Sequence, residues 1–410
     1  MSDTQFDVVV FGATSFVGQI LSRYLFERHG AVGGELRWAM AGRSAGKLEQ
    51  VRAELGEGAE AIELITADAA DGEALRAMCD RARVIVSTVG PYALYGSTLV
   101  GICAETGADY CDLTGEVQWI RRMLDAHEPT AKANGARIVH CCGFDSIPSD
   151  LGVLYHQQQF AAEHGGAASR IRMRVKGMKG AMSGGTVASM MNITREVAAD
   201  PKLRKALANP YLLVDGQAKK VRQPSVNFAE DDPKAGGWAA PFVMAGINTR
   251  IVHRSNALSG HAYGEGFVYD EAMATGRGNG GRMRAMGLAA GLAGFFTAAA
   301  IPPTRWVMER YVVPKPGEGP SPEAQRKGFF DLRFYGSDEQ GHALVTRVTG
   351  DRDPGYGSTA KMLGEAAACL AELPKDKCEG GFWTPSTALG EPLIERLQAH
   401  AGLTFERVEG

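Results

Sequence analysis

A loop between two glycines near the start of the chain has the residue types and spacing of a phosphate-binding site. It follows an apolar run from Phe6 to Phe11 and opens a segment with helical spacing. The first glycine permits a tight turn, the last lets a helix pack closely on a strand, and the free N–H groups of the helix attract a pyrophosphate. We therefore predict that the loop binds a dinucleotide. Its residues are Gly12, Ala13, Thr14, Ser15, Phe16, Val17 and Gly18.

Ser15 departs from the usual form of this motif, which has glycine at that position. Its Cβ restricts the approach of the backbone to a phosphate, whereas its hydroxyl is able to donate a hydrogen bond to one. The spacing of the loop is intact, so the prediction of a dinucleotide site stands.

The residues after the second predicted strand, Leu36 to Ala41, indicate which dinucleotide binds. Asp or Glu at this place contacts the ribose 2′-hydroxyl of NAD. Here the strand is followed by Arg43, Ser44 and Lys47 without an acidic residue, and a guanidinium pairs well with a 2′-phosphate. We therefore predict NADP as the cofactor. Asp68, just past the third predicted strand, is a candidate for the adenine amino group or, alternatively, a helix cap.

Two more loops follow predicted strands, at the edge where parallel sheets bind their ligands. The loop after the fourth strand contains two tyrosines that either donate protons or pack the loop. The loop after the sixth strand either faces the nicotinamide or caps the next helix, with Pro148 in its first turn. The cofactor-binding candidates are Ser87, Thr88, Val89, Gly90, Pro91, Gly143 and Phe144, and the catalytic candidates are Tyr92, Tyr95, Asp145 and Ser146.

A Gly-rich loop, residues 183–186, leads to a Met-rich segment further along the chain. Methionine adapts to irregular apolar ligands, although it is also common in protein cores. We expect Thr186 and Met190 to contact the substrate. The cysteines and histidines show no zinc-type spacing, so we expect no metal.

The elements that position these loops alternate between strand and helix over the first part of the chain, as in βαβ units. Residues 1–148 are predicted to form a Rossmann-type, doubly wound parallel sheet in an α/β fold. Residues 149–352 are predicted to form an antiparallel α+β domain, with Thr249–Ser255 as one of its strands. Residues 353–410 are predicted to return to the first domain with their helices and with a last strand, Leu403–Val408.

Composition and charge exclude some classes of protein. The 410 residues are 45% hydrophobic and 22% charged, so wholesale disorder is excluded. A net charge of −3 provides no general attraction to nucleic acid, and none is expected as a partner. Seven cysteines without a C-x-x-C pair, and no basic region before the first apolar run, predict a cytoplasmic protein.

The segment from Ala285 to Thr304 has no charged residue and is flanked by arginines. Its length matches a bilayer span, but it is mostly Ala and Gly and ends in Pro302 and Pro303. A packed internal helix is the favoured interpretation. A peripheral membrane contact through residues 285–305, and hence membrane association, is the second alternative, and a true span is the third.

Several motifs occur together in an order that resembles a known family. They are GATSFVG, AGR, STVGPYALYG, YCDLTGE, CCGFDSIPSDLG, SGGT and PKPGEGPS. The chain resembles the saccharopine dehydrogenase-like oxidoreductases and, within them, the mycobacterial-type trans-acting enoyl reductases. The resemblance covers nearly the whole chain and implies a Rossmann domain, an α+β second domain and the use of NADP.

Three functions follow as hypotheses. The favoured one is NADPH-dependent reduction of an enoyl group on an acyl or polyketide-type chain, free or carrier-bound. The second is imine reduction of the saccharopine type, whose substrate carries several carboxylates and needs converging cations. Basic residues for that purpose include Arg172, Arg174, Arg250 and Arg254, although the strand arginines are equally compatible with a solvated face. The third is a non-catalytic dinucleotide-binding protein at a membrane surface. A homodimer is the candidate assembly.

Overall fold

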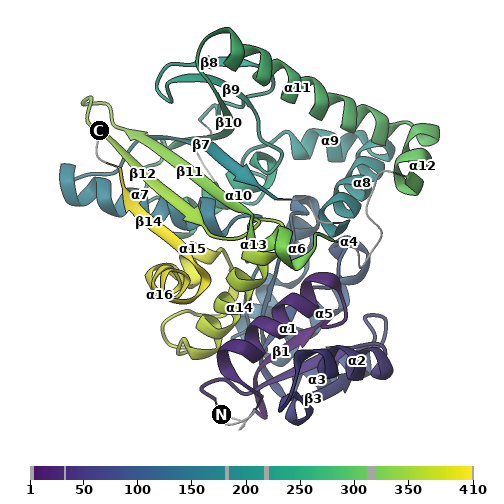
Figure 1. Cartoon of the computed structure of the whole chain (residues 1–410). Helices are drawn as coiled ribbons and strands as arrows, with labels where there is room; N and C mark the ends of the chain where they lie inside the picture. The colour runs from purple at the N-terminus through teal and green to yellow at the C-terminus, as the bar shows by residue number, and fades with distance from the viewer. Residues whose placement is uncertain (1–3, 32–33, 181–183, 217–220, 312–318, 409–410) are drawn as a thin grey trace.

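Two seven-stranded sheets form the framework of the protein in a computed structural model that describes residues 4–31, 34–180, 184–216, 221–311 and 319–408 (Figure 1). The first sheet, sheet A, has the strand order β13-β6-β5-β4-β1-β2-β3, and all its neighbouring strands are parallel. The second sheet, sheet B, has the order β14-β12-β11-β7-β10-β9-β8. The predicted α/β fold with a Rossmann-type parallel sheet is confirmed.

Sheet A forms because its strands are apolar on both faces and helices cover each face. Val8 and Val10 of the central strand belong to a core with α1, α2 and α14, whereas Val9 and Phe11 belong to a second core with α3, α5 and α6. The strands are β1 (Phe6–Phe11), β2 (Trp38–Gly42), β3 (Glu63–Thr66), β4 (Ala82–Ser87), β5 (Asp109–Asp112), β6 (Arg137–Val139) and β13 (Gly381–Trp383). The helices are α1 (Phe16–His29), α2 (Ala45–Leu55), α3 (Gly72–Cys79), α4 (Tyr92–Tyr95), α5 (Ser97–Thr106), α6 (Val117–Asn134) and α14 (Gly357–Glu372).

The C-terminal part of the chain contributes to both sheets. As predicted, it returns to sheet A, where α14 packs on α1 and strand β13 pairs with β6. The predicted return of the last strand is wrong, because β14 (Leu403–Arg407) pairs with β12 of sheet B and buries Leu403 and Phe405 in that core. The helical part of the chain before this strand is divided into α15 (Pro385–Ala388), α16 (Gly390–Arg396) and a π-turn (Leu397–Ala401).

Sheet B is mixed rather than antiparallel. Strands β11 and β12 are antiparallel neighbours, as expected for this domain, but β7 and β10 are parallel neighbours. The chain between them is long enough for the crossover that parallel pairing requires, and it includes α8, α9 and α10. The remaining strands are β7 (Arg170–Lys179), β8 (Glu230–Asp232), β9 (Gly237–Pro241), β10 (Val268–Gly276), β11 (Phe329–Ser337) and β12 (Ala343–Gly350), with helices α7 (Ile147–His164), α8 (Gly184–Ala199), α9 (Pro201–Leu207), α10 (Ala245–Leu258) and α13 (Pro322–Arg326).

The structure bears on two predictions for the middle of the chain, a strand and a domain boundary. The strand predicted over Thr249–Ser255 lies inside helix α10, where buried residues Ile247, Ile251 and Ser255 recur with a helical period. The predicted domain boundary at residue 148 falls in the first turn of α7, which leads from sheet A to sheet B.

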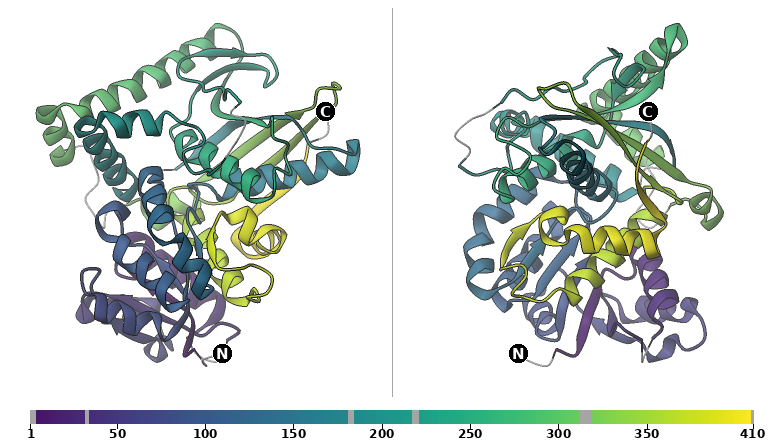
Figure 2. Two further views of the ribbon diagram at one scale, coloured as in Figure 1. Left: turned by 180° about the vertical axis from the view of Figure 1, so that it is seen from behind. Right: turned by 90° about the vertical axis from the view of Figure 1, so that its left-hand side faces the viewer.

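Helix α11 (Gly278–Ala300) and the following α12 (Pro302–Tyr311) lie along the outer edge of the molecule (Figures 1 and 2). The expectation of a packed internal helix is wrong, since 11% of the most apolar stretch of α11 is buried. Among the described residues, α11 is the one helix long and apolar enough to cross a bilayer by length and composition. The prediction was wrong because it was based on composition, and a helix rich in Ala and Gly is also typical of a protein core.

Candidate functional site

The phosphate loop has the backbone geometry that a pyrophosphate needs. Gly12 has a φ of +89°, and a Cβ there would lie 2.7 Å from Oγ1 of Thr88. A Cβ on Gly18 would lie 2.1 Å from the carbonyl oxygen of Gly12. Neither position has room for a side chain, so the turn holds the first N–H groups of α1 close to any ligand at the loop. This is the cradle that a dinucleotide pyrophosphate fits.

Ser15 holds the loop together. Its hydroxyl accepts a hydrogen bond of 2.9 Å from the N–H of Gly18, which caps α1, and shares one of 2.9 Å with the hydroxyl of Thr88. Thr88 in turn donates to the carbonyl oxygen of Gly12 at 2.9 Å. The hydroxyl of Ser15 is thus engaged with protein groups rather than available to a phosphate. The residue still lines the cavity described below, so the serine does not close the loop.

The end of β2 suits the 2′-phosphate of NADP. Arg43 and Lys47 are exposed there, and no described carboxylate pairs with either. Ser44 caps α2 and accepts from the N–H of Lys47 at 3.4 Å. Asp68 is exposed and does not cap α3, because Asp71 does, so the prediction that Asp68 contacts the adenine stands untested.

A cavity of about 400 Å³ extends from the phosphate loop into the space between α8 and α10. Small-molecule sites typically measure roughly 300–1,000 Å³. Its walls are mainly apolar, and Phe296 of α11 also lines it. The predicted residues that line it are Ser15, Phe16, Val17, Thr88, Gly90, Pro91, Tyr92, Asp145 and Met190. The side chain of Thr186, like Ser183, lies outside the described residues.

Asp145 presents a carboxyl group to this cavity. No described side chain donates a hydrogen bond to it, and it lies against backbone, since a Cβ on Gly143 would be 3.0 Å from its Oδ2. Burial raises the pKa of Asp145 to about 7, and the charge of Asp112 adds to the rise, while its own backbone N–H opposes it. A carboxyl group with this pKa carries a proton for much of the time near neutral pH. It is therefore a candidate general acid.

The other three predicted proton donors do not offer a hydroxyl to the cavity. Tyr92 is buried and donates to the carbonyl oxygen of Ser87 at 2.9 Å. Tyr95 is half exposed and lies outside the cavity lining. Ser146 is fully buried and donates to Oδ1 of Asn248 at 3.1 Å, although it does occupy the N-cap position of α7. The catalytic roles predicted for these three residues stay predictions.

Gly143 and Phe144, predicted to contact the cofactor, lie outside the lining of this cavity. The N–H of Phe144 donates to the hydroxyl of Thr359 at 3.0 Å, and its ring packs on Phe330 of sheet B with a centroid distance of 5.0 Å. Gly143 is buried against the same Thr359 side chain. Neither residue lines the cavity, so Asp145 alone of this loop faces it.

Arg250 is a cavity residue that the sequence offered as one of several basic residues, on a predicted strand that the structure shows to be part of α10. Its guanidinium donates to Oγ1 of Thr249 at 3.1 Å and to the carbonyl oxygen of Leu207 at 2.6 Å. Its Nε has no partner, and no described carboxylate forms an ion pair with it. Burial lowers the pKa of Arg250, but an arginine stays charged at neutral pH. The cavity wall thus contains a cation without a counter-ion.

Glu116 and Tyr356 hold the walls of the cavity in place. The buried carboxylate of Glu116 accepts from the N–H groups of Tyr92 and Ala93 and from the hydroxyl of Ser189, so it ties α8 to α4. The hydroxyl of Tyr356 accepts from the N–H of Gly184 at 2.9 Å at the start of α8. Both act on helix α8, which carries the Met-rich wall.

Apart from Arg250, the basic residues that the sequence offered for a carboxylate substrate do not line the cavity. Arg174 is buried, contrary to a solvated strand face, and pairs with Asp232 at 2.6 Å and Asp270 at 2.7 Å. Arg254 is also buried and donates to the carbonyl oxygens of Leu213 and Phe382. Among the described arginines and lysines, Arg250 is the one that lines the cavity.

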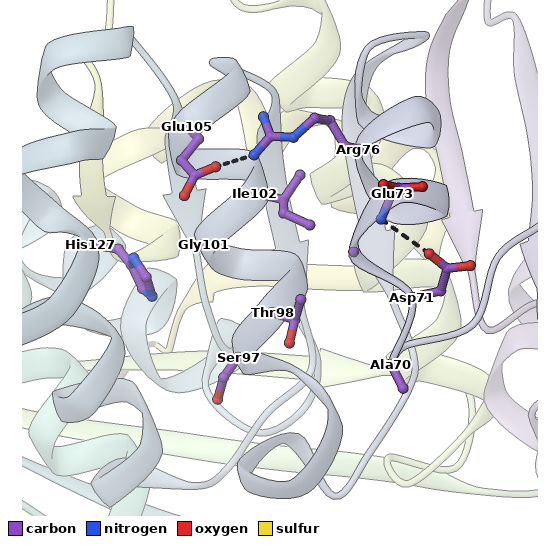
Figure 3. Close-up of a pocket in the computed structure, with 11 residues that line it drawn as sticks. Ala70, Asp71, Glu73, Arg76, Ser97, Thr98, Gly101, Ile102, Glu105 and His127 are labelled. Atoms are coloured by element: carbon purple, nitrogen blue, oxygen red, sulfur yellow. Dashed lines mark hydrogen bonds and ion pairs between the residues drawn. The ribbon is translucent and has the colours of Figure 1, made fainter.

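A second hollow, of about 710 Å³, lies between α3, α5 and α6 (Figure 3). Two of its charged groups are engaged within the protein: Arg76 pairs with Glu105, and Asp71 accepts from the N–H of Glu73. No residue of the phosphate loop lines it. We therefore assign the chemistry to the first cavity.

Comparison with known proteins agrees with this geometry. Residues 8–139 match the family model of the saccharopine dehydrogenase NADP binding domain. A Mycobacterium tuberculosis protein with the provisional name trans-acting enoyl reductase is 41% identical, over 98% of this chain and 97% of its own. The trans-acting enoyl reductase of Mycobacterium ulcerans is 37% identical, over 96% of each chain. The chain belongs to the saccharopine dehydrogenase-like oxidoreductase family. It is an NADP-dependent oxidoreductase.

Solved structures of this family's fold extend over the whole chain. Apo saccharopine dehydrogenase (L-Glu forming) from Saccharomyces cerevisiae has a TM-score of 0.53 at 14% identity and covers 98% of this chain and 99% of its own. Homospermidine synthase from Legionella pneumophila, in complex with NAD, has a TM-score of 0.50 at 11% identity and covers 100% and 92%. At these identities the likeness concerns the fold alone.

Proposed function

We propose that this oxidoreductase is an enoyl reductase that acts on an acyl or polyketide-type thioester. The observation that carries the proposal is Asp145, a carboxyl group with a raised pKa on the wall of a mainly apolar cavity that begins at the phosphate loop. The names of the relatives from Mycobacterium tuberculosis and Mycobacterium ulcerans support it. An apolar cavity suits a hydrocarbon chain better than a substrate with several charges.

The reaction that we propose divides the work between the cofactor and the protein. When bound, NADPH supplies a hydride for the β-carbon of the double bond and leaves as NADP⁺. Asp145 supplies the proton for the α-carbon: its O–H bond breaks, a C–H bond forms, and water later restores the proton. Arg250, on the cavity wall, supplies the positive charge that stabilises the substrate oxygen on which negative charge develops. The apolar walls exclude water and so strengthen both interactions.

A substrate panel tests the proposal. Purified protein is incubated with NADPH and trans-2-enoyl thioesters of increasing chain length, and in parallel with lysine and 2-oxoglutarate. We expect oxidation of NADPH with the enoyl thioesters alone, and in D₂O one deuterium at the α-carbon of the product. Reduction of the imine mixture instead would overturn the proposal. A single unpaired cation in the cavity is a poor match to the several carboxylates of that alternative substrate.

A further inference from the structure

Helices α11 and α12 expose large apolar side chains to water, and ligand binding in the cavity does not account for this exposure. Six large apolar side chains on them are between 39% and 73% exposed to water. Contiguous exposed apolar patches on a soluble protein mark interaction sites. The side chains are Met283, Met286, Leu288 and Phe296 on α11, and Trp306 and Val307 on α12.

The same two helices are strongly basic. Helix α11 contains no acidic residue, and α12 contains one, Glu309, whose side chain lies outside the description. Four arginines, Arg282, Arg284, Arg305 and Arg310, accompany the apolar side chains, and none of them forms an ion pair with a described residue. Apolar side chains beside unpaired arginines, with a tryptophan among them, match the boundary between the acyl region and the anionic headgroups of a membrane.

We propose that α11 and α12 dock on a lipid surface that carries anionic headgroups. The helix lies on such a surface rather than crossing it, because its first turns are fixed to sheet B. Gly281 and Ala285 are buried there, and the hydroxyl of Thr275 on β10 donates to the carbonyl oxygen of Gly281 at 2.9 Å. The chain then turns into α12 and returns to sheet B through α13 and β11.

The charges favour lipid over a second copy of the chain. A two-fold dimer interface brings the same patch of each protomer together. The four arginines of each protomer would then share one interface, and like charges at an interface are unfavourable. Anionic headgroups remove that repulsion.

Phe296 links the docking surface to the cavity. It is 39% exposed to water and also lines the cavity, beside Met190 and Ile193 of α8. If the protein acts on acyl chains, as proposed above, an apolar substrate dissolved in lipid reaches the cavity past this side chain. The docking itself does not depend on that function.

Vesicle flotation tests the docking independently of catalysis. The full chain is mixed with vesicles of phosphatidylcholine alone or of phosphatidylcholine with phosphatidylglycerol, and the fraction that floats is measured at low and high salt. We expect flotation with the anionic vesicles, weakened by salt. The double variant Met286→Glu/Leu288→Glu should lower partitioning by about tenfold or more, since it removes apolar contact and adds repulsion.

The control variant is Phe329→Glu, which changes an exposed aromatic residue on β11 and should float like the parent. NADPH binding by calorimetry should be equal in all three proteins, which shows that each is folded. Equal flotation of the parent and the double variant would overturn the proposal. So would a dimer, detected by light scattering, that the double variant abolishes, because the surface would then belong to a second copy. Absence of enoyl reduction with intact flotation would refute the proposed function alone.

Discussion

Asp145 and Asp150 lie five positions apart in the same segment and illustrate two uses of a buried carboxyl group. Burial raises the pKa of both, to about 7 for Asp145 and about 6 for Asp150. Asp150 accepts from the hydroxyl of Ser255 at 2.5 Å and from the N–H of Ser386 at 2.8 Å. Asp145 faces a cavity, and no side chain among the described residues donates to it.

The difference shows that burial alone does not identify a catalytic acid. The hydrogen bonds of Asp150 join α7 to α10 and to α15, so its carboxylate links elements of the fold. A desolvated carboxyl group without partners contributes nothing of this kind to the fold and is unfavourable for it. The presence of such a group beside the phosphate loop is explained if it donates its proton to a substrate.

The largest expected effect is on turnover. Asp145→Asn removes the acid with little change in shape, and we expect kcat for the enoyl substrate to fall by about 100- to 10,000-fold. NADPH binding should remain, as measured by calorimetry. Tyr95→Phe is the matched control, because that hydroxyl lies outside the cavity, and it should retain full activity. Equal activity of Asp145→Asn and the parent would mean that both carboxyl groups serve the fold.

The next largest effect concerns the choice between NADPH and NADH. It extends the comparison of Asp145 with Asp150 to two arginines. Arg43 has no ion-pair partner among the described residues, whereas Arg174 is buried and paired, like Asp150. Arg43→Ala should weaken NADPH binding by about 10- to 100-fold, since a charge-assisted contact to the 2′-phosphate is lost. NADH binding should stay the same in calorimetry. A loss that is equal for both dinucleotides would place Arg43 away from the 2′-phosphate.

For the free energy of unfolding we expect the opposite order, with the larger effect at Asp150. Asp150→Asn leaves the N–H of Ser386 without a charged acceptor, and we expect the free energy of unfolding in urea to fall by about 1–3 kcal/mol. The kcat of the folded fraction should not change. Asp145→Asn is the control here, because no hydrogen bond from another side chain is lost. If Asp145→Asn were the more destabilising of the two, the assignment of roles would be reversed.

The parts of the molecule that sequence could predict are those set by local pattern. A continuous apolar run such as Phe6–Phe11 is typical of a strand buried on both faces, and Gly12 and Gly18 mark the loop after it. The partners of Asp150 could not be predicted, because Ser255 and Ser386 are brought together by the tertiary fold. Nor could the alternation in Thr249–Ser255 be distinguished from a helix, since short apolar segments fit both periods. That ambiguity placed Arg250 on a strand, whereas it lies on helix α10.

The exposure of α11 was missed for a different physical reason. An uncharged run of Ala, Gly and a few large apolar residues indicates that the helix avoids water, but it does not say whether protein or lipid covers it. The answer depends on which elements pack beside it, and the helix meets sheet B and α8 along one narrow face. The flanking arginines were the signal that favoured lipid.

The pH dependence of turnover follows from the pKa of Asp145. The group must be protonated to act, so kcat should fall as pH rises above about 7. The residual rate of Asp145→Asn should show no such fall, because the amide does not titrate. Rates are measured with saturating NADPH across this range. A parent profile that stays level through pH 8 or about 9 would indicate a different proton donor.

The smallest expected effect is on the pH dependence of stability. The folded protein keeps the proton of Asp145 up to about pH 7, whereas the unfolded chain loses it near pH 4, at about the ordinary pKa of aspartate. The stabilisation due to this proton is therefore complete below about pH 4 and is lost as pH rises to about 7.

Asp150 contributes a similar decline that ends near its own pKa of about 6. Asp145→Asn should consequently flatten the decline between about pH 6 and 7 and leave the part that belongs to Asp150. Urea unfolding of the parent and the variant at closely spaced pH values measures this difference, and identical slopes between those two values would show that Asp145 does not titrate there.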